Sequence, residues 1–386
     1  MSILDRLAGA IGYERRAADP SWSALSGGGT LASSGALVNA RTSENLSTVL
    51  ACVGAISSAL ASLPAYCYRV LPTGREEDRG HPVAKLTRRP NHNMTWPDWV
   101  EFTVSEVLRF GNALSVIETD GTGQPTALRP VPWQNVQVIL LPSGRLAFDV
   151  IHIVGPFGGT GQPRRYLDSE VFHLKDRSDD GLLGRSRLSR APEVLGNALG
   201  LQEYVGSMWA NQATPGGVVK IASRLDQAQY TTLAARFNQK YAGTGNAKKT
   251  MILDNGADWQ PMSVSPEDAE VLASRRFSVE ELCRLFQVPP PIVQDYTHNT
   301  FTNSAQAALW FAQFSLATWA TKIEAEFARS VFVDDTHRLE IDLSGLTRGD
   351  WATRWQAWKI ATDGGILDAN EIREMEGFNP RPVAAP

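Results

Sequence analysis

The sequence predicts an α+β fold in which helical segments flank a β-rich section. Apolar residues recur at helical spacing early in the chain, as in Leu46, Val49, Val53, Ile56 and Leu60. Between residues 112 and 175, short apolar runs are instead separated by turns that contain glycine and proline, which is typical of strands. No repeat period is found, so a repeat array is not expected.

The composition of the chain excludes some classes of protein. Its 386 residues carry a net charge of -4, whereas a protein that grips nucleic acid along its length usually displays a basic stripe. The three scattered cysteines do not suit a disulfide framework or a metal cluster, which fits a reducing cytoplasm. The uncharged run 45–68 is dotted with serines and ended by Pro64, so we expect a buried helix and no membrane segment.

The first part of the chain is expected to lead from a flexible arm into an α+β unit. Residues 1–41 are rich in glycine, serine and alanine in their second half, which indicates a flexible arm. The fold is expected to begin near Thr42. A helix to about residue 63, a strand at 65–70, a helix at 96–110 and then the strands complete a unit that runs to residue 186.

The second part is expected to consist of two long helices around a small insert. Helical patterns predict a helix at 187–213 and another at 265–288, with a compact α/β insert at 214–264 between them. After a polar segment at 289–303 come a long helix and a strand within 304–343, and a helical tail fills 344–386.

A run of three prolines follows the second long helix. Pro289, Pro290 and Pro291 have no amide hydrogen and a restricted φ, so they cannot extend a helix or join a central strand. We therefore expect the prolines to stop the helix and to form a stiff elbow before the polar segment.

The segment GTGNAKKT, residues 243–250, is close to a phosphate-binding loop. Lys248 stands where the second glycine of that motif belongs, and the expected order is helix then strand rather than strand then helix. A basic surface turn is therefore favoured over ATP binding, although a nucleotide hydrolase that uses residues 243–250 remains an alternative function.

Other candidates for chemistry favour structural roles. No two histidines have zinc-ligand spacing, so neither a metal nor a cofactor is predicted. His173 lies in an alternating strand pattern, where a hydrogen-bonded structural histidine is expected, and Cys283 is expected to be a buried thiol. Ser186 is a helix cap or, alternatively, a nucleophile. Two pairs of acidic residues are expected to be exposed loop carboxylates rather than a cation site: Asp179 with Asp180, and Asp334 with Asp335.

The insert carries an excess of positive charge. Between residues 214 and 262, six basic residues face three acidic ones, which gives +3. This excess suggests a docking surface that includes Lys220, Arg224, Lys248 and Lys249, while a solvated loop without a partner remains open.

Four segments together resemble the phage portal protein family. They are PNHNMTWPDWVEFTVSEVLRFGNALSV, EVFHLKDRSDDGLLGRSRL, RRFSVEELCRLFQVPPPIV and GGILDANEIREMEGFNP, in the family's order, and the resemblance extends over residues 42–380. The sequence departs from the family pattern at a few positions. Gln294 stands where a glycine is usual, Pro291 is an additional proline, Leu114 replaces a common aromatic residue and Arg187 follows Ser186 where proline is frequent.

The resemblance implies a ring-shaped, usually dodecameric portal at one capsid vertex, without enzymatic activity. The terminase large subunit would drive double-stranded DNA through its channel, and other partners would be the major capsid protein and a head-tail adaptor. The location would be a phage virion or gene transfer agent particle assembled in the bacterial cytoplasm. The implied parts are a wing (42–186), two stem helices (187–213 and 265–288), a clip (214–264), a tunnel loop (289–303), a long helix with a strand (304–343) and a crown (344–386).

In this interpretation the tunnel loop lies in the channel near moving DNA. The residues expected there are Tyr296, Thr297, His298, Asn299, Thr300, Phe301, Thr302 and Asn303. The loop has no lysine or arginine from residue 294 to 303, so it can touch phosphates without trapping them. A loop that contacts a neighbouring subunit, or an adaptor ring that conducts no DNA, remains an alternative.

Overall fold

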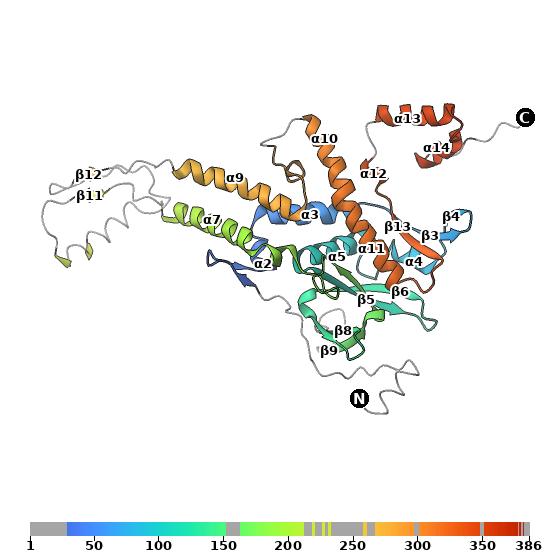
Figure 1. The fold of residues 1–386 in the computed structure, drawn as a ribbon, viewed down its shortest axis with the longest axis horizontal. Coiled ribbons are helices and arrows are strands. Elements are labelled where there is room, and N and C mark those ends of the chain that lie inside the picture. The colour runs from blue at the N-terminus through green and yellow to red at the C-terminus, as the bar shows by residue number, and fades with distance from the viewer. Residues whose placement is uncertain are drawn as a thin grey trace, which may run out of the picture.

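The computed structural model describes residues 29–151, 163–211, 218–220, 226–227, 231–232, 258–260, 267–296, 301–347, 351–376, 378–379 and 381. Within this part of the chain, no helix combines the length and apolar content needed to span a bilayer. Helices and a β-rich section are both present, as Figure 1 shows.

The described chain contains helices of very different length. They are α2 (Ala40–Ser43), α3 (Ser47–Ala61), α4 (Pro82–Leu86), α5 (Trp96–Phe110), α6 (Arg187–Arg190), α7 (Pro192–Asn211), α9 (Glu267–Phe286), α10 (Phe301–Trp310), α11 (Ala317–Ser330), α12 (Ser344–Thr347), α13 (Trp351–Asp363) and α14 (Ala369–Met375). A π-helical segment, η5 (Phe311–Leu316), joins α10 to α11, and 3₁₀ turns are η1 (Trp133–Asn135), η2 (Asp168–Glu170) and η4 (Pro290–Val293).

The strands form small antiparallel sheets with the orders β1-β2, β10-β5-β6, β13-β3-β4, β7-β8-β9 and β11-β12. Their bounds are β1 (Thr30–Leu31), β2 (Leu37–Val38), β3 (Ala65–Leu71), β4 (Gly74–Glu77), β5 (Asn112–Thr119), β6 (Pro125–Val131), β7 (Val136–Leu140), β8 (Leu146–Ile151), β9 (Pro163–Leu167), β10 (Val171–Lys175), β11 (Val218–Lys220), β12 (Asp258–Gln260) and β13 (His337–Ile341). The mixture of helices and antiparallel sheets confirms the predicted α+β class.

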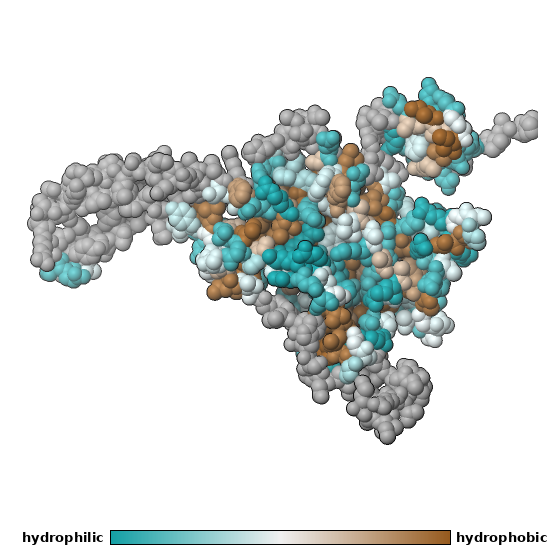
Figure 2. All heavy atoms as spheres, in the orientation of Figure 1, coloured by the Kyte–Doolittle hydropathy of each residue, from teal (hydrophilic) through white to brown (hydrophobic). Residues whose placement is uncertain are grey.

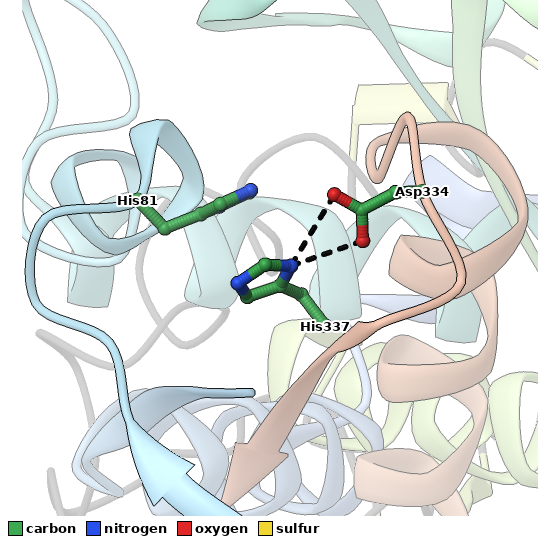
Figure 3. Close-up of side chains that lie close together, drawn as sticks. All are labelled: His81, Asp334 and His337. Carbon is green, nitrogen blue, oxygen red and sulfur yellow. Dashed lines mark hydrogen bonds and ion pairs between the residues drawn. The ribbon is translucent and has the colours of Figure 1, made fainter. Parts of the chain in front are cut away.

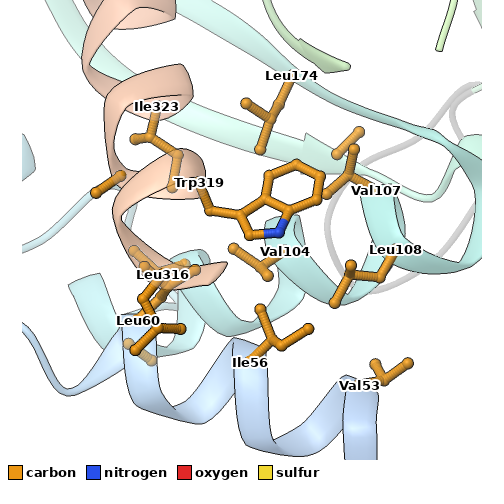
Figure 4. Close-up of a cluster of buried hydrophobic side chains, with 14 of the residues drawn as sticks. Val53, Ile56, Leu60, Val104, Val107, Leu108, Leu174, Leu316, Trp319 and Ile323 are labelled. Atoms are coloured by element: carbon orange, nitrogen blue, oxygen red, sulfur yellow. The ribbon is translucent and has the colours of Figure 1, made fainter. Parts of the chain in front are cut away.

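The main core lies where α3, α5 and α11 meet the sheet β10-β5-β6. Trp319 of α11 is 2% exposed, and Figure 4 shows its ring with Leu174 on one side and Val104 on the other. Burying an aromatic side chain of this size contributes about 3 kcal/mol of stability. The core therefore fixes the position of α11 against the sheet.

The helices α7 and α9 leave this core side by side and extend away from the body (Figure 1). Exposed aromatic side chains lie on both of them, because Tyr204 is 54% and Phe277 is 56% exposed. Figure 2 shows a second exposed apolar surface on the α13–α14 unit, where Ile360 and Ile366 lie in solvent. Contiguous exposed apolar surface is typical of protein–protein contacts, whereas single exposed side chains are common on any protein.

Three strands that the apolar pattern did not predict all lie at sheet edges. They are β4, β6 and β9, and each pairs on one side only. Pro125 and Pro130 in β6 lack amide hydrogens, while β4 and β9 are mostly polar. Edge strands need no apolar run, which explains why periodicity missed them.

Part of the predicted arm (1–41) is folded. Residues 1–28 lie outside the described part, but β1, β2 and α2 are formed ahead of the predicted start at Thr42. The hairpin packs on α7, where the backbone N–H of Ser33 donates to Glu193 Oε1 at 3.1 Å. A Cβ on Gly196 of α7 would collide with Ala32. The small residues that indicated flexibility therefore serve close packing here.

Two predicted helices have different bounds. The helix expected at 187–213 is broken at Ala191 (φ -129°, ψ 53°), because Pro192 follows and a residue before proline disfavours the helical conformation. The helix expected from Ser304 begins at Phe301 and contains η5 in its middle. The helix expected at 96–110 is confirmed: Thr95 and Asp98 form a capping box, and Gly111 (φ 82°) ends the helix.

Two backbone segments of the β-rich section touch at Gly111 and Gly184. A Cβ on Gly184 would lie well inside van der Waals contact of the Gly111 carbonyl oxygen and 2.8 Å from the Asp176 nitrogen. The Asn112 side chain joins the same segments, since its Nδ2 donates to Gly184 O at 2.8 Å and its Oδ1 accepts from Gly184 N at 2.9 Å. His173 Nε2 lies 3.0 Å from Asn112 Oδ1 and the ring is buried, which confirms the structural histidine.

We expect Gly184→Ala to lower the free energy of unfolding by about 3 kcal/mol or more, because the added methyl group meets backbone atoms that cannot move aside. Urea denaturation of the purified protein measures this. The control is Gly206→Ala in α7, where nothing lies within 4 Å, and which should stabilise by up to about 1 kcal/mol. Equal stability of the two variants would contradict the close approach.

Candidate functional site

The C-terminal end of α9 is closed by a left-handed turn. The helix ends at Phe286, and Gln287 follows with φ 58°. The N–H of Gln287 donates to Arg284 O at 3.2 Å, and the N–H of Val288 donates to Cys283 O at 2.9 Å. This pair of hydrogen bonds is a Schellman motif, which satisfies the last carbonyls of a helix. The helix thus ends at Phe286 in its own left-handed turn, ahead of the first proline and two residues before the predicted end at residue 288.

The prolines instead build a second turn of the same kind. Pro289 is extended, and the following residues form η4. Gln294 is again left-handed (φ 66°), with its N–H donating to Pro291 O at 3.1 Å, while the N–H of Asp295 donates to Pro290 O at 3.0 Å. Two successive left-handed turns thus make the stiff elbow, which we define as residues 287–295.

Both left-handed positions are held by residues other than glycine. Within the described residues, Gln287 and Gln294 are the non-glycine positions with positive φ. Such a conformation costs about 1 kcal/mol for an L-residue with a Cβ. The surrounding structure must therefore hold the elbow in place.

Arg187, the first residue of α6, holds the end of α9. Its Nη1 donates to Phe286 O at 2.6 Å and to Leu285 O at 3.4 Å. A cation at this position satisfies terminal carbonyls and interacts favourably with the negative end of the helix dipole. Arg187 therefore joins the start of the first long helical region to the end of the second.

The same arginine is paired with a buried carboxylate of the β-rich section. Arg187 Nε lies 3.2 Å from Asp176 Oδ2, and these side chains are 14% and 9% exposed. Lys322 Nζ of α11 lies 4.0 Å from the other oxygen of Asp176, and burial lowers the pKa of this lysine. Asp176 thus couples the β-rich section to both the elbow and α11.

The π-helical segment η5 packs on the other side of the elbow. The Ser315 hydroxyl donates to the Gln287 carbonyl oxygen, at the left-handed residue itself. Phe311 and Leu316 are buried, whereas Trp310 and Phe314 are 44% and 59% exposed, with ring centroids 5.3 Å apart. The elbow is therefore held by Arg187 on one side and by η5 on the other, and it leaves an aromatic pair exposed beside it.

The structure describes only part of the predicted tunnel loop. Tyr296 is 61% exposed, and Thr297, His298, Asn299 and Thr300 lie outside the described residues. The backbone of Phe301, Thr302 and Asn303 forms the first turn of α10, so these three residues are helical rather than part of a loop. The helix expected from Ser304 thus begins three residues earlier.

The predicted docking cations cannot be compared with the structure beyond one backbone position. Lys220 is the last residue of β11, while Arg224, Lys248, Lys249 and the GTGNAKKT segment lie outside the described residues.

Three other predictions from the sequence are confirmed. Ser186 caps α6, with its Oγ accepting from Ser189 N at 3.0 Å. Cys283 is buried, next to Cys52 of α3. Asp179 is half exposed and pairs with Arg185 and Arg190, so it is a loop carboxylate.

Among the described residues, His81, Asp334 and His337 form a group of potential metal ligands that the sequence did not reveal. Zinc-ligand spacing can be recognised in a sequence only when the ligands lie close together along the chain, whereas these residues come from two distant segments.

Comparison with known proteins shows the family. The family model for "Phage portal protein" matches residues 47–377. The chain belongs to the phage portal protein family. The portal protein of Enterobacteria phage HK97 is 29% identical over 87% of this chain and 80% of its own length. The probable portal protein of Streptomyces phage phiC31 is 27% identical over 96% of this chain and 83% of its own length.

A solved structure has a similar overall fold. A chain from the neck of a native gene transfer agent particle with C12 symmetry has a TM-score of 0.64 and 22% identity, and covers 98% of this chain and 100% of its own. This similarity shows the fold.

Two departures from the portal family pattern now have a physical meaning. Gln294, where a glycine is usual in the family, has the left-handed conformation that glycine adopts at no steric cost. Arg187 stands where proline is frequent and provides the cap of α9. The sequence marked both positions as unusual without showing that they act at the same elbow.

We expect Arg187→Met to lower the free energy of unfolding by about 3 kcal/mol, because it leaves Asp176 buried with only the more distant Lys322 as a cation. Chemical denaturation measures the change. The matched control is Arg185→Met, whose ion pair with Asp179 is about half exposed and should matter by less than about 1 kcal/mol. If both variants lose the same small amount, Arg187 does not hold the elbow.

Proposed function

We propose that this portal protein is one subunit of a ring, usually dodecameric in the family, whose channel passes double-stranded DNA at a capsid vertex. The elbow carries the proposal, since it leads from a helix end held by Arg187 and Ser315 into residues 294–303, which contain no lysine or arginine. Family membership supports it. A similar fold in a neck with C12 symmetry supports a ring of several subunits.

The elements correspond to portal parts as follows in this proposal. The β-rich section and the core are the wing (42–186), and α7 with α9 form the stem. The insert at 214–264 is the clip, residues 294–300 form the tunnel loop, the helical run α10–η5–α11 and β13 line the wing, and 344–386 form the crown. The protein acts structurally, without chemistry of its own.

Electrostatics suits a conduit for DNA. A duplex carries one charge per about 1.7 Å of its axis, so cations in a narrow channel would bind it and slow it. Hydroxyl, amide and imidazole groups of the tunnel loop touch phosphates only transiently. The loop then keeps contact with DNA without holding it.

Exposed aromatic residues suit side-by-side packing of subunits. Tyr204 on α7, Phe277 on α9 and the pair Trp310 and Phe314 beside the elbow are about half exposed in the single chain. Neighbouring subunits in a ring would cover such surfaces.

Partners are assigned by charge and position. The cations Lys220, Arg224, Lys248 and Lys249 of the clip dock the terminase large subunit during packaging and the head-tail adaptor afterwards, while the wing meets the major capsid protein. The assembled ring resides in the virion or virion-like particle, after assembly in the bacterial cytoplasm.

We expect the double substitution His298→Lys and Thr300→Lys to slow DNA packaging, most strongly at low salt, because added cations bind phosphates. Packaging by assembled particles at several salt concentrations measures this. The control is Gln134→Lys with Gln137→Lys, exposed on the β-rich section. Normal, salt-insensitive packaging in the first variant would contradict the tunnel assignment and favour a ring that conducts no DNA.

We expect Lys248→Gln with Lys249→Gln to weaken terminase binding by about tenfold at low salt while rings still form, because the steering charges are lost. Surface plasmon resonance measures the affinity, and electron microscopy checks the rings. The control is Lys85→Gln with Lys359→Gln, which removes the same charge from exposed sites elsewhere. Equal affinity of the wild type and the first variant would count against docking at the clip.

A further inference from the structure

A group of three side chains meets beside the sheet β13-β3-β4. His81 precedes α4, Asp334 lies in the turn before β13, and His337 is the first residue of β13. One ligand atom from each lies within 4.8 Å of the other two. Figure 3 shows a ring nitrogen of His81 and one of His337 turned toward the carboxylate of Asp334. These three side chains define what we term the His–Asp group.

The His337 ring faces a carboxylate at each nitrogen. Its Nδ1 lies 3.0 Å from Asp334 Oδ1, and its Nε2 lies 3.3 Å from Asp78 Oδ2. If Nε2–H donates to Asp78, the lone pair of Nδ1 faces the oxygen of Asp334. In that tautomer Nδ1 and the Asp334 oxygen both offer lone pairs to one bound cation, while the Thr336 hydroxyl also lies 3.0 Å from Nδ1.

The surroundings of His337 are those of a metal-bound histidine. A ligating histidine commonly donates its other N–H to a carboxylate, which orients the ring. Asp78 occupies that position and is itself held by Arg69 Nη2 at 2.8 Å. The hydrogen bonds of His337 and Thr336 hold the pKa of Asp334 well below its usual range, so its carboxylate is ionised.

His81 can supply the third ligand. Its ring stacks on that of His337 with centroids 4.3 Å apart. Burial, with the nearby His337, lowers the pKa of His81, which favours the neutral ring that metals bind. Its Nδ1 accepts a hydrogen bond from Val83 N at 3.2 Å, so Nε2 remains for a metal. Binding there moves the ring proton to Nδ1 and releases the amide of Val83.

We propose that His81, Asp334 and His337 bind a divalent transition metal of the zinc class, with Asp78 as a positioning residue. Two imidazoles and one carboxylate are a ligand set used by zinc with an open fourth position. Tetrahedral zinc places its donors about 3.3 Å apart, and Nδ1 of His337 and Oδ1 of Asp334 are already 3.0 Å apart. The Asp334 side chain is 46% exposed, which leaves the group open to solvent.

The metal would join two distant parts of the chain. His81 follows β4, whereas Asp334 and His337 follow α11, so the ion would tie α4 to the start of β13. Because a metal that binds only the folded state adds stability by mass action, melting would shift upward with zinc.

The test uses the full-length protein after treatment with a chelator. Isothermal titration with Zn²⁺ should show one site per chain with micromolar affinity, and Co²⁺ should give the visible absorption of a four-coordinate ion. Asp334→Asn and His81→Gln should each weaken binding by at least about tenfold. Affinity should also fall as the pH is lowered below about 6, because protons compete for the imidazoles.

Matched controls are Asp335→Asn and His92→Gln, which remove an exposed neighbouring carboxylate and an exposed histidine and should leave affinity unchanged. Hydrogen exchange at the Val83 amide should become faster when Zn²⁺ is bound, although the protein becomes more stable overall. Absence of saturable binding, or equal affinity of the wild type, Asp334→Asn and His81→Gln with unchanged melting curves, would overturn the proposal.

Discussion

The cap that Arg187 places on the end of α9 is the interaction on which the elbow depends. The left-handed conformation at two non-glycine residues costs conformational energy. The backbone groups that form hydrogen bonds within each turn could also form them with solvent. The guanidinium binds the terminal carbonyls from one side, and Ser315 binds the Gln287 carbonyl from another. Because Asp176 neutralises the arginine in a buried position, the cap cannot leave without exposing an unpaired charge.

Asp176 is itself positioned by the close contact between two glycines. The N–H of Asp176 donates to Gly111 O at 2.9 Å, and Gly184 passes so near that no side chain fits there. Asn112 closes the same contact, and the buried His173 completes the hydrogen bonds of that amide. A continuous set of polar contacts therefore runs from the sheet β10-β5-β6 to the base of α9. The family motifs around Gly111 and Gly184 thus lie in one structural unit with the elbow.

Much of the fold could be predicted from the sequence, because its helices have strong apolar periodicity. The helix α5 was predicted to the residue, since Thr95, Asp98 and Gly111 mark its ends by local chemistry. Edge strands such as β6 could not be predicted from an apolar run, since one side of them faces solvent. Left-handed conformation at Gln287 could not be predicted either, because it results from tertiary contacts of Arg187 and Ser315 rather than from the residue itself.

The sequence predicted where the elbow lies, but not which interactions form it. The proline run indicated a stiff elbow, but local sequence cannot show that a Schellman motif ends the helix at Phe286. The His–Asp group could not be predicted at all, because His81 and His337 meet only after β3 and β13 pair. Long-range pairing of strands creates such groups, and a spacing rule along the chain cannot find them.

The polar outer strands have a consequence for how copies of this chain can associate. Pro125 and Pro130 withhold hydrogen-bond donors along β6, and charged side chains line β4 and β9. Intermolecular strand addition, the route by which open sheets grow into fibrils, is thereby blocked at these three borders. At these borders, association through helical surfaces is favoured over the addition of strands, which suits assembly that ends at a closed number of copies.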